Sequence, residues 1–282
     1  MKIARAIDDL RKAVADARRS GRTIGFVPTM GALHAAHMSL VRIARERSDY
    51  SVVSIFVNPT QFGPGEDFER YPRTPEQDCE LLEADGVDLA YIPSHSEMYT
   101  KDAAITVDPG PVSQVFEGRA RPTHFRGVLT VVAKLFGQVQ PDAAVFGEKD
   151  AQQLFLVKKM VSDLDMPIEI VAGPTLREED GLAISSRNRY LKIAERKKAD
   201  VLYRALEAGI EAYERGDRKL ESVRGVMKGV IDEVPEFDPD YFTVVDDRTF
   251  AEADPIGDDP RFIIAGRLGS VRLIDNQRPP ND

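Results

Sequence analysis

Cysteine is almost absent from this sequence: its 282 residues contain a single one, Cys79. One thiol cannot form an intrachain disulfide or build a cysteine-rich metal site. Cys79 lies in the helical pattern TPEQDCELLEADG, so we expect a packed thiol rather than a nucleophile. The cysteine count therefore excludes disulfide scaffolds and zinc-thiolate modules.

Long apolar runs are also missing. No segment approaches the run of about 20 apolar residues that a membrane-spanning helix needs. The first 21 residues alternate charged with small apolar residues. This pattern is typical of an amphipathic helix and lacks the apolar centre of a signal peptide. We therefore expect no membrane association and a cytoplasmic location.

Basic residues are outnumbered, with 38 Lys and Arg against 47 Asp and Glu and a formal net charge of −9. General affinity for nucleic acid depends on basic surface that releases counterions, so we expect no nucleic-acid partner. A local basic pocket for one nucleotide stays compatible with this charge. No internal repeat or low-complexity tract is visible, and 42% hydrophobic residues suffice for a sizeable core.

Between residues 23 and 171, short apolar runs alternate with helical patterns. The runs lie at 23–27, 51–57, 87–93, 142–146 and 168–171. The helical patterns lie at 37–48, 75–85, 125–139 and 150–164. Nearly continuous apolar strands separated by helices are typical of a parallel sheet covered on both faces. We predict a Rossmann-like, doubly wound α/β domain over residues 1–174.

The pattern changes after about residue 174. The loop-like stretch LREEDGLAISSRNRYL comes first, and two charged helices follow at 193–215 and 219–234. Short strands are expected at 241–245, 261–265 and 271–274. We predict a smaller α+β domain over residues 175–282 that can close over the first as a lid.

The segment PTMGALHAAH follows the first long strand, and its glycine turn leads into a helix. His34 and His37 are three residues apart and so share a helix face. A helix N-terminus favours anions, and imidazoles there can donate hydrogen bonds to phosphate oxygens. A structural histidine and a metal site are the alternatives. The metal site fits less well, because no glutamate lies between the histidines and no cysteine cluster completes a ligand shell.

A second polar segment, GEKDAQQ, also lies between a strand and a helix. Lys149 could neutralise phosphate, and Asp150 could hold Mg²⁺ or a ribose hydroxyl. The alternative is a helix cap at Asp150 with a solvated Lys149. A helix cap does not account for the paired amides of Gln152 and Gln153. If one of these side chains faces inward, its amide could bind a hydroxyl or a carboxylate.

The third segment, ISSRN, sets two hydroxyls beside an arginine at 184–188. Ser185, Ser186 and Arg187 could clamp phosphate. A polar surface turn is the alternative.

Together these segments resemble the nucleotidylyltransferase superfamily, with its HIGH-like and KMSKS-like elements. They resemble more closely the pantothenate synthetase (pantoate–β-alanine ligase) family. The motifs that carry this resemblance occur in the family's order between Pro28 and Asn276. They are PTMGALHAAH, SIFVNPTQF, YPRTPEQD, RPTHFRGV, QPDAAVFGEKDAQQL, DGLAISSRNRYL and RLIDN.

The resemblance implies an ATP-dependent ligase that condenses (R)-pantoate with β-alanine to pantothenate. The reaction would pass through a pantoyl-adenylate and release pyrophosphate and AMP. ATP as substrate, Mg²⁺ as cofactor and a homodimer are implied in the same way. Two other functions stay open: a nucleotidylyltransferase that stops at nucleotide transfer, and a nucleotide-binding module that has lost catalysis.

The resemblance also assigns residues. The catalytic group would be His34, His37, Lys149 and Arg187, with His37 as proton donor. The ATP contacts would be Met30, His34, His37, Gly147, Glu148, Lys149, Asp150, Leu176, Ile184, Ser185, Ser186 and Arg187. Leu176 would line the adenine pocket and Asp150 would be linked to magnesium. Gln61 and Gln153 would hold pantoate, with Asn58 beside them.

Two residues depart from the family's pattern. Ala36 stands between the histidines where the family usually has glycine, and Thr60 stands where it commonly has methionine. Ala36 matters if the backbone there needs unusual dihedral angles or a close approach to phosphate. Thr60 could reshape the pantoate pocket. For Arg121 and His124, a role at the rim of the active site and a structural role are both open.

Overall fold

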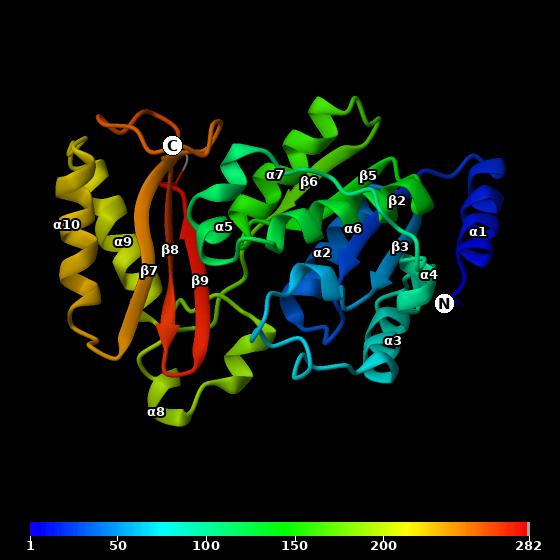
Figure 1. The fold of residues 1–282 in the computed structure, drawn as a ribbon, viewed down its shortest axis with the longest axis horizontal. Coiled ribbons are helices and arrows are strands. Elements are labelled where there is room, and N and C mark those ends of the chain that lie inside the picture. The colour runs from blue at the N-terminus through cyan, green and yellow to red at the C-terminus, as the bar shows by residue number, and fades with distance from the viewer. Residues whose placement is uncertain (281–282) are drawn as a thin grey trace. The chain divides into compact units, whose positions relative to one another are not determined.

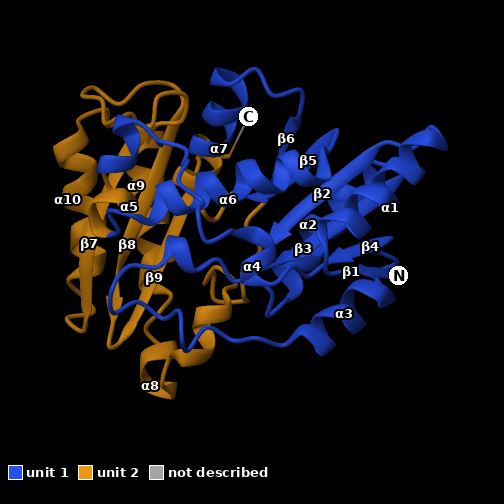
Figure 2. Cartoon of the chain, turned by 45° about the vertical axis from the view of Figure 1, so that its right-hand side comes forward, with its two compact units in different colours: residues 1–114, 121–147, 156–173 blue, residues 115–120, 148–155, 174–282 orange. Residues whose placement is uncertain are grey.

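The computed structural model describes residues 1–280 (Figure 1). The chain divides into two compact units (Figure 2). Unit 1 consists of Met1–Gln114, Arg121–Gly147 and Leu156–Gly173. Unit 2 consists of Val115–Ala120, Glu148–Phe155 and Pro174–Asp282. The roles assigned from sequence to residues 1–174 and 175–282 stay predictions.

A six-stranded parallel sheet forms the centre of unit 1, in the order β1-β4-β3-β2-β5-β6. The strands are β1 (Lys2–Ala4), β2 (Ile24–Thr29), β3 (Tyr50–Ile55), β4 (Leu89–Tyr91), β5 (Ala143–Gly147) and β6 (Glu169–Gly173). The helices are α1 (Ile7–Arg19), α2 (Ala35–Glu46), α3 (Pro75–Ala84), α4 (His95–Met98), α6 (His124–Val139) and α7 (Ala151–Asp163), and residues 151–155 of α7 belong to unit 2. Two 3-10 turns are η1 (Pro59–Gln61) and η2 (Pro111–Gln114). The predicted doubly wound parallel sheet is confirmed.

The order of the strands creates a topological switch point. The chain runs outward from β2 to β3 and β4 and then returns to pair β5 with the other side of β2. Because both pairs are parallel, the carboxyl ends of β2 and β5 lie at one edge of the sheet. In open α/β sheets this is the edge where ligands bind.

One face of the sheet is covered by α2 and α3. Val27, Val53 and Val145 point to this face and pack with Met38 of α2 and Leu82 of α3 in one buried cluster. Successive residues of a strand face opposite sides, so each strand must supply apolar residues to both. This explains why the strands were recognisable as nearly unbroken apolar runs.

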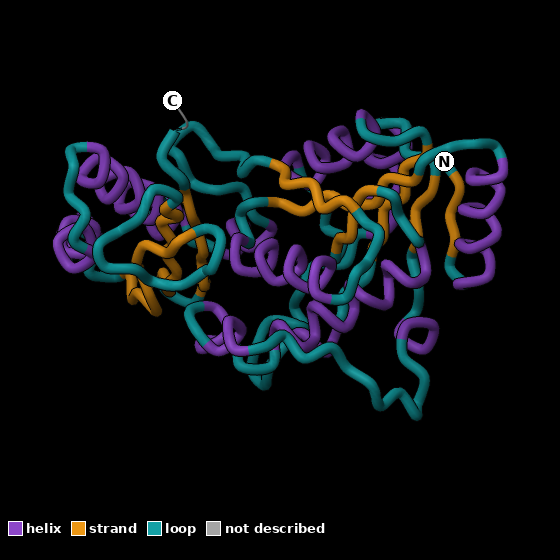
Figure 3. Tube along the Cα trace, turned by 90° about the horizontal axis from the view of Figure 1, so that it is seen from above, coloured by secondary structure: helices purple, strands orange, loops and turns teal. Residues whose placement is uncertain are grey.

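The opposite face packs against α6. The ring of Phe136 lies 6.4 Å from the ring of Phe26 in β2 and 6.2 Å from that of Phe146 in β5, both edge to face. Such edge-to-face pairs add stability beyond the apolar area that they bury. Helices therefore lie on both sides of the strands (Figure 3).

A three-stranded antiparallel sheet, in the order β7-β8-β9, forms the centre of unit 2. Its strands are β7 (Phe237–Asp246), β8 (Pro260–Leu268) and β9 (Val271–Gln277). The helices are α5 (Glu117–Ala120), α8 (Ile193–Arg196), α9 (Val201–Glu214) and α10 (Leu220–Ile231), and η3 (Ser186–Tyr190) is a 3-10 turn. Leu202 and Leu206 of α9 and Met227 of α10 pack against Phe262 and Ile264 of β8. The predicted smaller α+β part is confirmed in architecture.

Two expectations about single elements are wrong. The first residues are not all helical, because Lys2–Ala4 form an edge strand that pairs with β4. The predicted helix 193–215 is two helices, α8 and α9, separated by a turn at 197–200. Arg196 of α8 pairs with Glu178 and Asp180 on the preceding loop, at 2.6 and 2.5 Å. These ion pairs tie α8 to the loop that precedes it.

Within residues 1–280, no helix is both long and apolar enough to cross a membrane.

Replacement of Phe136 by alanine tests the packing of the sheet on α6. The side chain is 3% exposed, so its loss should lower the free energy of unfolding by about 3–5 kcal/mol. Urea denaturation followed by circular dichroism measures this. Leu164→Ala serves as the control, since Leu164 is 55% exposed and should change stability by no more than about 0.5 kcal/mol. Equal losses in both variants would contradict the packing described.

Candidate active site

The loop after β2 has a backbone that requires glycine. Gly31 has φ +79°, and a Cβ there would lie 2.9 Å from both the Asp78 carboxylate and the Ile55 side chain. The buried carboxylate of Asp78 then accepts the N–H groups of Ala32 at 2.9 Å and Leu33 at 2.8 Å. Asp78 therefore fixes the course of the loop that leads to the histidines. It lies within the motif YPRTPEQD, but no role could be assigned to it from the sequence.

His34 and His37 lie side by side at the start of α2. Their ring centroids are 4.0 Å apart with 31° between the planes, so the predicted shared face is confirmed. The helix begins at Ala35, directly after His34, which occupies the N-cap position. Histidine stands there in place of the Ser, Thr, Asp or Asn that commonly cap helices. The imidazole rings of His34 and His37 therefore lie at the N-terminal turn of α2.

Ala36 lies inside α2 and has no positive φ. The backbone at this position is ordinary right-handed helix, which alanine favours over glycine by about 1 kcal/mol. The departure from the family's glycine therefore causes no backbone strain.

A buried amide organises the segment after β3. Asn58, 1% exposed, accepts hydrogen bonds at Oδ1 from the hydroxyls of Tyr99 at 3.0 Å and Thr60 at 2.9 Å. Its Nδ2 donates to Gln61 Oε1 and to the Gly127 carbonyl, both at 3.1 Å. With one N–H hydrogen donated to Gln61 Oε1, Asn58 is suited to orient the Gln61 amide, and its predicted contact with the substrate stays a prediction.

Gln61 is held through its main chain as well. Its carbonyl accepts from His124 Nδ1 at 3.0 Å and from Arg121 Nη2 at 3.3 Å. Because a carbonyl only accepts, Nδ1 of His124 carries the hydrogen, and Nε2 accepts from Arg121 Nη1 at 3.1 Å. The other end of the Gln61 side chain, Nε2, lies 3.2 Å from Met30 Sδ at the end of β2. The structure thus brings Met30, Asn58 and Gln61 together.

Glu66 keeps Arg121 in place. Its two carboxylate oxygens accept from Arg121 at 3.0 and 2.7 Å. Partial burial pushes the pKa of Glu66 upward, but the hydrogen bond and the charge of Arg121 outweigh it and hold this pKa below its usual value. The pair is therefore ionised at neutral pH. Arg121 and His124, left open between rim and structure by the sequence, support the backbone of Gln61.

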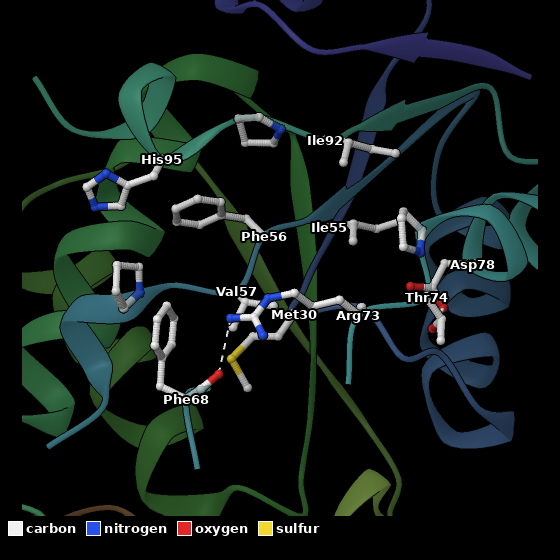
Figure 4. Close-up of a pocket in the computed structure, with 14 residues that line it drawn as sticks. Met30, Ile55, Phe56, Val57, Phe68, Arg73, Thr74, Asp78, Ile92 and His95 are labelled. Carbon is white, nitrogen blue, oxygen red and sulfur yellow. Dashed lines mark hydrogen bonds between the residues drawn. The ribbon is translucent and has the colours of Figure 1, made fainter. Parts of the chain in front are cut away.

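A cavity of about 570 Å³ is lined in part by Met30 (Figure 4). Its walls are mainly apolar, including Ile55, Phe56 and Ile92. Arg73 also lines it and donates to the Phe68 carbonyl at 3.1 Å, as the dashed line shows. Within residues 1–280, Met30, a predicted ATP contact, is the only site residue predicted from the sequence that lines this cavity.

The second predicted segment, GEKDAQQ, includes the point where the chain passes from unit 1 to unit 2. Gly147 ends β5 in unit 1, and Glu148, Lys149 and Asp150 follow in unit 2 ahead of α7. The carbonyls of Glu148 and Lys149 accept from the side chain of Asn276, at 2.9 and 2.8 Å. Asn276 was known from the sequence only as part of the motif RLIDN, with no role assigned.

Of the two paired glutamines, Gln152 is the buried one. Its Oε1 accepts the Glu117 N–H at 3.0 Å, and its Nε2 donates to the Val115 carbonyl at 3.0 Å. Gln152 therefore ties the segment 115–117 to α7 within unit 2. The half-buried Gln153 is the other member of the pair.

The third predicted segment, ISSRN, begins at the end of a short hairpin of residues 176–184 in unit 2. The Ile184 N–H donates to the Leu176 carbonyl at 2.9 Å, and Arg177 and Ala183 form a bridge beside them. Ser185 then caps η3, since its Oγ accepts the Arg187 N–H at 3.3 Å. The structure thus brings Leu176 and Ile184 together, with Ser185, Ser186 and Arg187 at the end of the hairpin.

Comparison with known proteins gives one consistent result. A model of the family described as Pantoate-beta-alanine ligase matches residues 2–278. A pantothenate synthetase from Chloroflexus aurantiacus is 50% identical over 277 residues, which cover 98% of this chain and 97% of the relative. One from Acidothermus cellulolyticus is 51% identical over 280 residues, covering 97% of this chain and 90% of the relative.

Solved structures agree. The pantothenate synthetase of Thermus thermophilus superposes with a TM-score of 0.94 at 47% identity, covering 98% of this chain and 99% of that one. The pantoate-beta-alanine ligase of Francisella tularensis, solved with Beta-gamma ATP and Beta-alanine, superposes with a TM-score of 0.79 at 33% identity, covering 98% and 97%. The chain therefore belongs to the pantoate–β-alanine ligase (pantothenate synthetase) family.

Proposed function

We propose that this ligase joins pantoate to β-alanine in two steps at the expense of ATP. A carboxylate oxygen of pantoate attacks the α-phosphorus of ATP, and the bond to pyrophosphate breaks. The amine nitrogen of β-alanine then attacks the acyl carbon of the adenylate and loses a proton, and AMP leaves with the electrons of the C–O bond. The observation that best supports this is the oriented amide of Gln61 beside Met30 at the end of β2.

In this proposal, Gln61 and Gln153 hold pantoate. A neutral amide can bind the hydroxyls and the carboxylate of pantoate without a salt bridge, which would weaken the attacking oxygen as a nucleophile. Asn58 serves to fix the direction of the Gln61 amide. Positioning of this kind can supply about 7–11 kcal/mol of the barrier reduction.

The histidines and the basic residues would act on ATP. His37 is proposed as proton donor, with His34 beside it on the phosphates, and Lys149 and Arg187 meet the negative charge that spreads over the phosphates. The proposed ATP contacts are Met30, His34, His37, Gly147, Glu148, Lys149, Asp150, Leu176, Ile184, Ser185, Ser186 and Arg187. The close stacking of the His34 and His37 rings supports a shared ligand.

Magnesium is proposed as the ion that accompanies ATP. Within residues 1–280, no three His, Cys, Asp or Glu side chains lie together as a metal-binding group. Mg²⁺ commonly binds through one or two carboxylates, substrate phosphates and water, so one exposed carboxylate, Asp150, fits that requirement. When bound, the ion would neutralise charge on the phosphates. A homodimer is proposed from the family resemblance, and light scattering of the purified protein tests it. The cytoplasmic location expected from the sequence pattern is kept as a proposal.

Product analysis distinguishes the proposed reaction from its alternatives. With ATP and pantoate we expect pyrophosphate, and with β-alanine added we expect AMP and pantothenate, measured by coupled assay and chromatography. Formation of ADP would contradict the adenylate mechanism. A nucleotidylyltransferase would release no AMP in response to the amine. Tight ATP binding without turnover would indicate a module that has lost catalysis.

Replacement of His37 by alanine tests the proposed proton donor. Loss of general acid catalysis should reduce the rate of pyrophosphate release about 10²–10⁴-fold, with little change in melting temperature. His37→Gln keeps a hydrogen-bond donor and should retain more activity than His37→Ala. Near-normal rates in both variants would show that the histidine has been wrongly assigned.

Replacement of Gly127 by alanine tests the support of Gln61. A Cβ at Gly127 would lie 2.4 Å from the Thr60 carbonyl oxygen and 2.6 Å from the Gln61 nitrogen, so the backbone of η1 must shift. A displacement near 1 Å should lower kcat/KM for pantoate on the order of 100-fold. Gly137→Ala is the matched control, because Gly137 lies in the same helix and a Cβ there meets nothing within 4 Å. Identical pantoate kinetics in the two variants would refute the support proposed for Gln61.

A further inference from the structure

Two adjacent buried residues at the end of the chain, Asp275 and Asn276, have no role in the reaction described so far. They lie on β9 with exposed fractions of 3% and 4%. Both are polar, and a buried polar group costs free energy unless it is fully hydrogen-bonded. Their partners within unit 2 are therefore informative.

The side chain of Asn276 is held in one orientation. Arg261 Nη1 donates to Asn276 Oδ1 at 2.6 Å, and because arginine only donates, this atom must be the oxygen. Arg261 is itself fixed by Asp247, which accepts from its Nη2 at 3.2 Å and also from its Nε. The two hydrogens of Asn276 Nδ2 are thus directed at the carbonyls of Glu148 and Lys149, at 2.9 and 2.8 Å.

Asp275 holds a different segment. Its carboxylate accepts from Arg177 in two hydrogen bonds, Nη1 to Oδ2 at 2.6 Å and Nη2 to Oδ1 at 3.1 Å. Arg177 also donates to the Asn276 carbonyl at 3.1 Å and to the Gly181 carbonyl at 2.9 Å. Arg177 follows Leu176 directly, so the hairpin 176–184 is attached to β9 through this pair. Burial raises the pKa of Asp275, and the paired Arg177 counteracts that effect.

These contacts join two segments that are far apart in sequence. The residues 148–149 and the hairpin 176–184 both contain proposed ATP contacts, and both are attached to neighbouring residues of one strand. A lysine side chain is a flexible stem with a charged end, so the point where its charge acts depends on where its main chain is held. Asn276 holds that main chain on both sides of the Lys149 Cα, at the Glu148 carbonyl before it and the Lys149 carbonyl after it.

We propose that Asn276 is a positioning residue for adenylation: its amide fixes the main chain of Lys149 so that the ammonium group meets the phosphates of ATP, while Arg261 fixes the direction of the amide. The neighbouring Asp275–Arg177 pair aligns the hairpin that contains Leu176 and Ile184. This inference rests on the proposed function, in which Lys149 binds phosphate.

The test is a double-mutant cycle between Asn276 and Lys149. The variants are Asn276→Ala, Lys149→Ala and the two combined, with pyrophosphate release from ATP and pantoate as the assay. Asn276→Asp is the second probe, since it keeps the size of the side chain and an oxygen for Arg261 but loses both donors. Thr243→Val is the matched control: Thr243 is 1% exposed in the same sheet, and its hydroxyl donates to Glu252 rather than to an ATP segment.

Asn276→Ala should lower kcat/KM for ATP on the order of 100-fold, as expected for a catalytic group displaced by about 1 Å. KM for β-alanine should not change. In the Lys149→Ala background, the same substitution should cost no more than about 2-fold, because the group that it positions is gone. Asn276→Asp should lose at least as much activity as Asn276→Ala. Thr243→Val should lose a similar amount of melting temperature while keeping its activity.

The inference is overturned if Asn276→Ala reduces the rate by the same factor with and without Lys149, since a general loss of structure would act independently of that lysine. Full activity of Asn276→Asp would overturn it as well. A wild-type protein that releases no pyrophosphate from ATP and pantoate would instead refute the proposed function, and the inference with it. Full activity of Lys149→Ala would refute the role of that lysine, on which the positioning depends.

Discussion

Complete hydrogen bonding of buried asparagine amides is the constraint that holds the Gln61 side chain in unit 1 and the Lys149 main chain in unit 2. Asn58 in unit 1 and Asn276 in unit 2 each have an oxygen fixed by donors and an NH₂ group that bridges two acceptors. An amide whose oxygen and nitrogen both have dedicated partners has one stable orientation, because turning it over would set donor against donor. A single orientation of the amide then fixes the positions of the groups that are hydrogen-bonded to it.

Neutral amides suit this purpose better than charged groups. A carboxylate in place of either asparagine would set an oxygen against the carbonyl oxygens it now binds and would add buried negative charge, which is costly without a partner. An apolar residue of similar size would leave those carbonyls unsatisfied. Where the chain does bury a carboxylate, as at Asp78 and Asp275, backbone N–H groups or an arginine compensate the charge.

The fold was largely predictable because its strands are buried on both faces and so appear as apolar runs. The edge strand β1 could not be predicted, since two of its three residues are exposed and the charged residues around it are typical of a helix. The break between α8 and α9 coincides with ion pairs from Arg196 to a loop 16 and 18 residues earlier. Sequence periodicity reports only on contacts within an element, so it could not indicate this break.

The candidate site also has a part that could be predicted from the sequence and a part that could not. The histidine pair could be predicted because it depends on helix spacing alone, within one turn of α2. The supporting residues could not, since Asn276 and Glu148 are 128 positions apart and Asn58 and Gly127 are 69 apart. Asp78 illustrates the difficulty: in PEQDCELL it has the pattern of a solvated helix residue, yet its carboxylate is buried against a loop 45 residues earlier.

The two departures from the family's pattern differ in physical meaning. Ala36 occupies ordinary helix, where a methyl group in place of hydrogen favours the same backbone. Thr60 instead adds a hydroxyl that donates to Asn58 Oδ1, the atom that also accepts from Tyr99. A methionine could not make this bond, so the threonine strengthens the fixed orientation of the Asn58 amide. The substitution therefore acts on the support of Gln61, and through Gln61 on any acid bound there, while the amide that would contact that acid is unchanged.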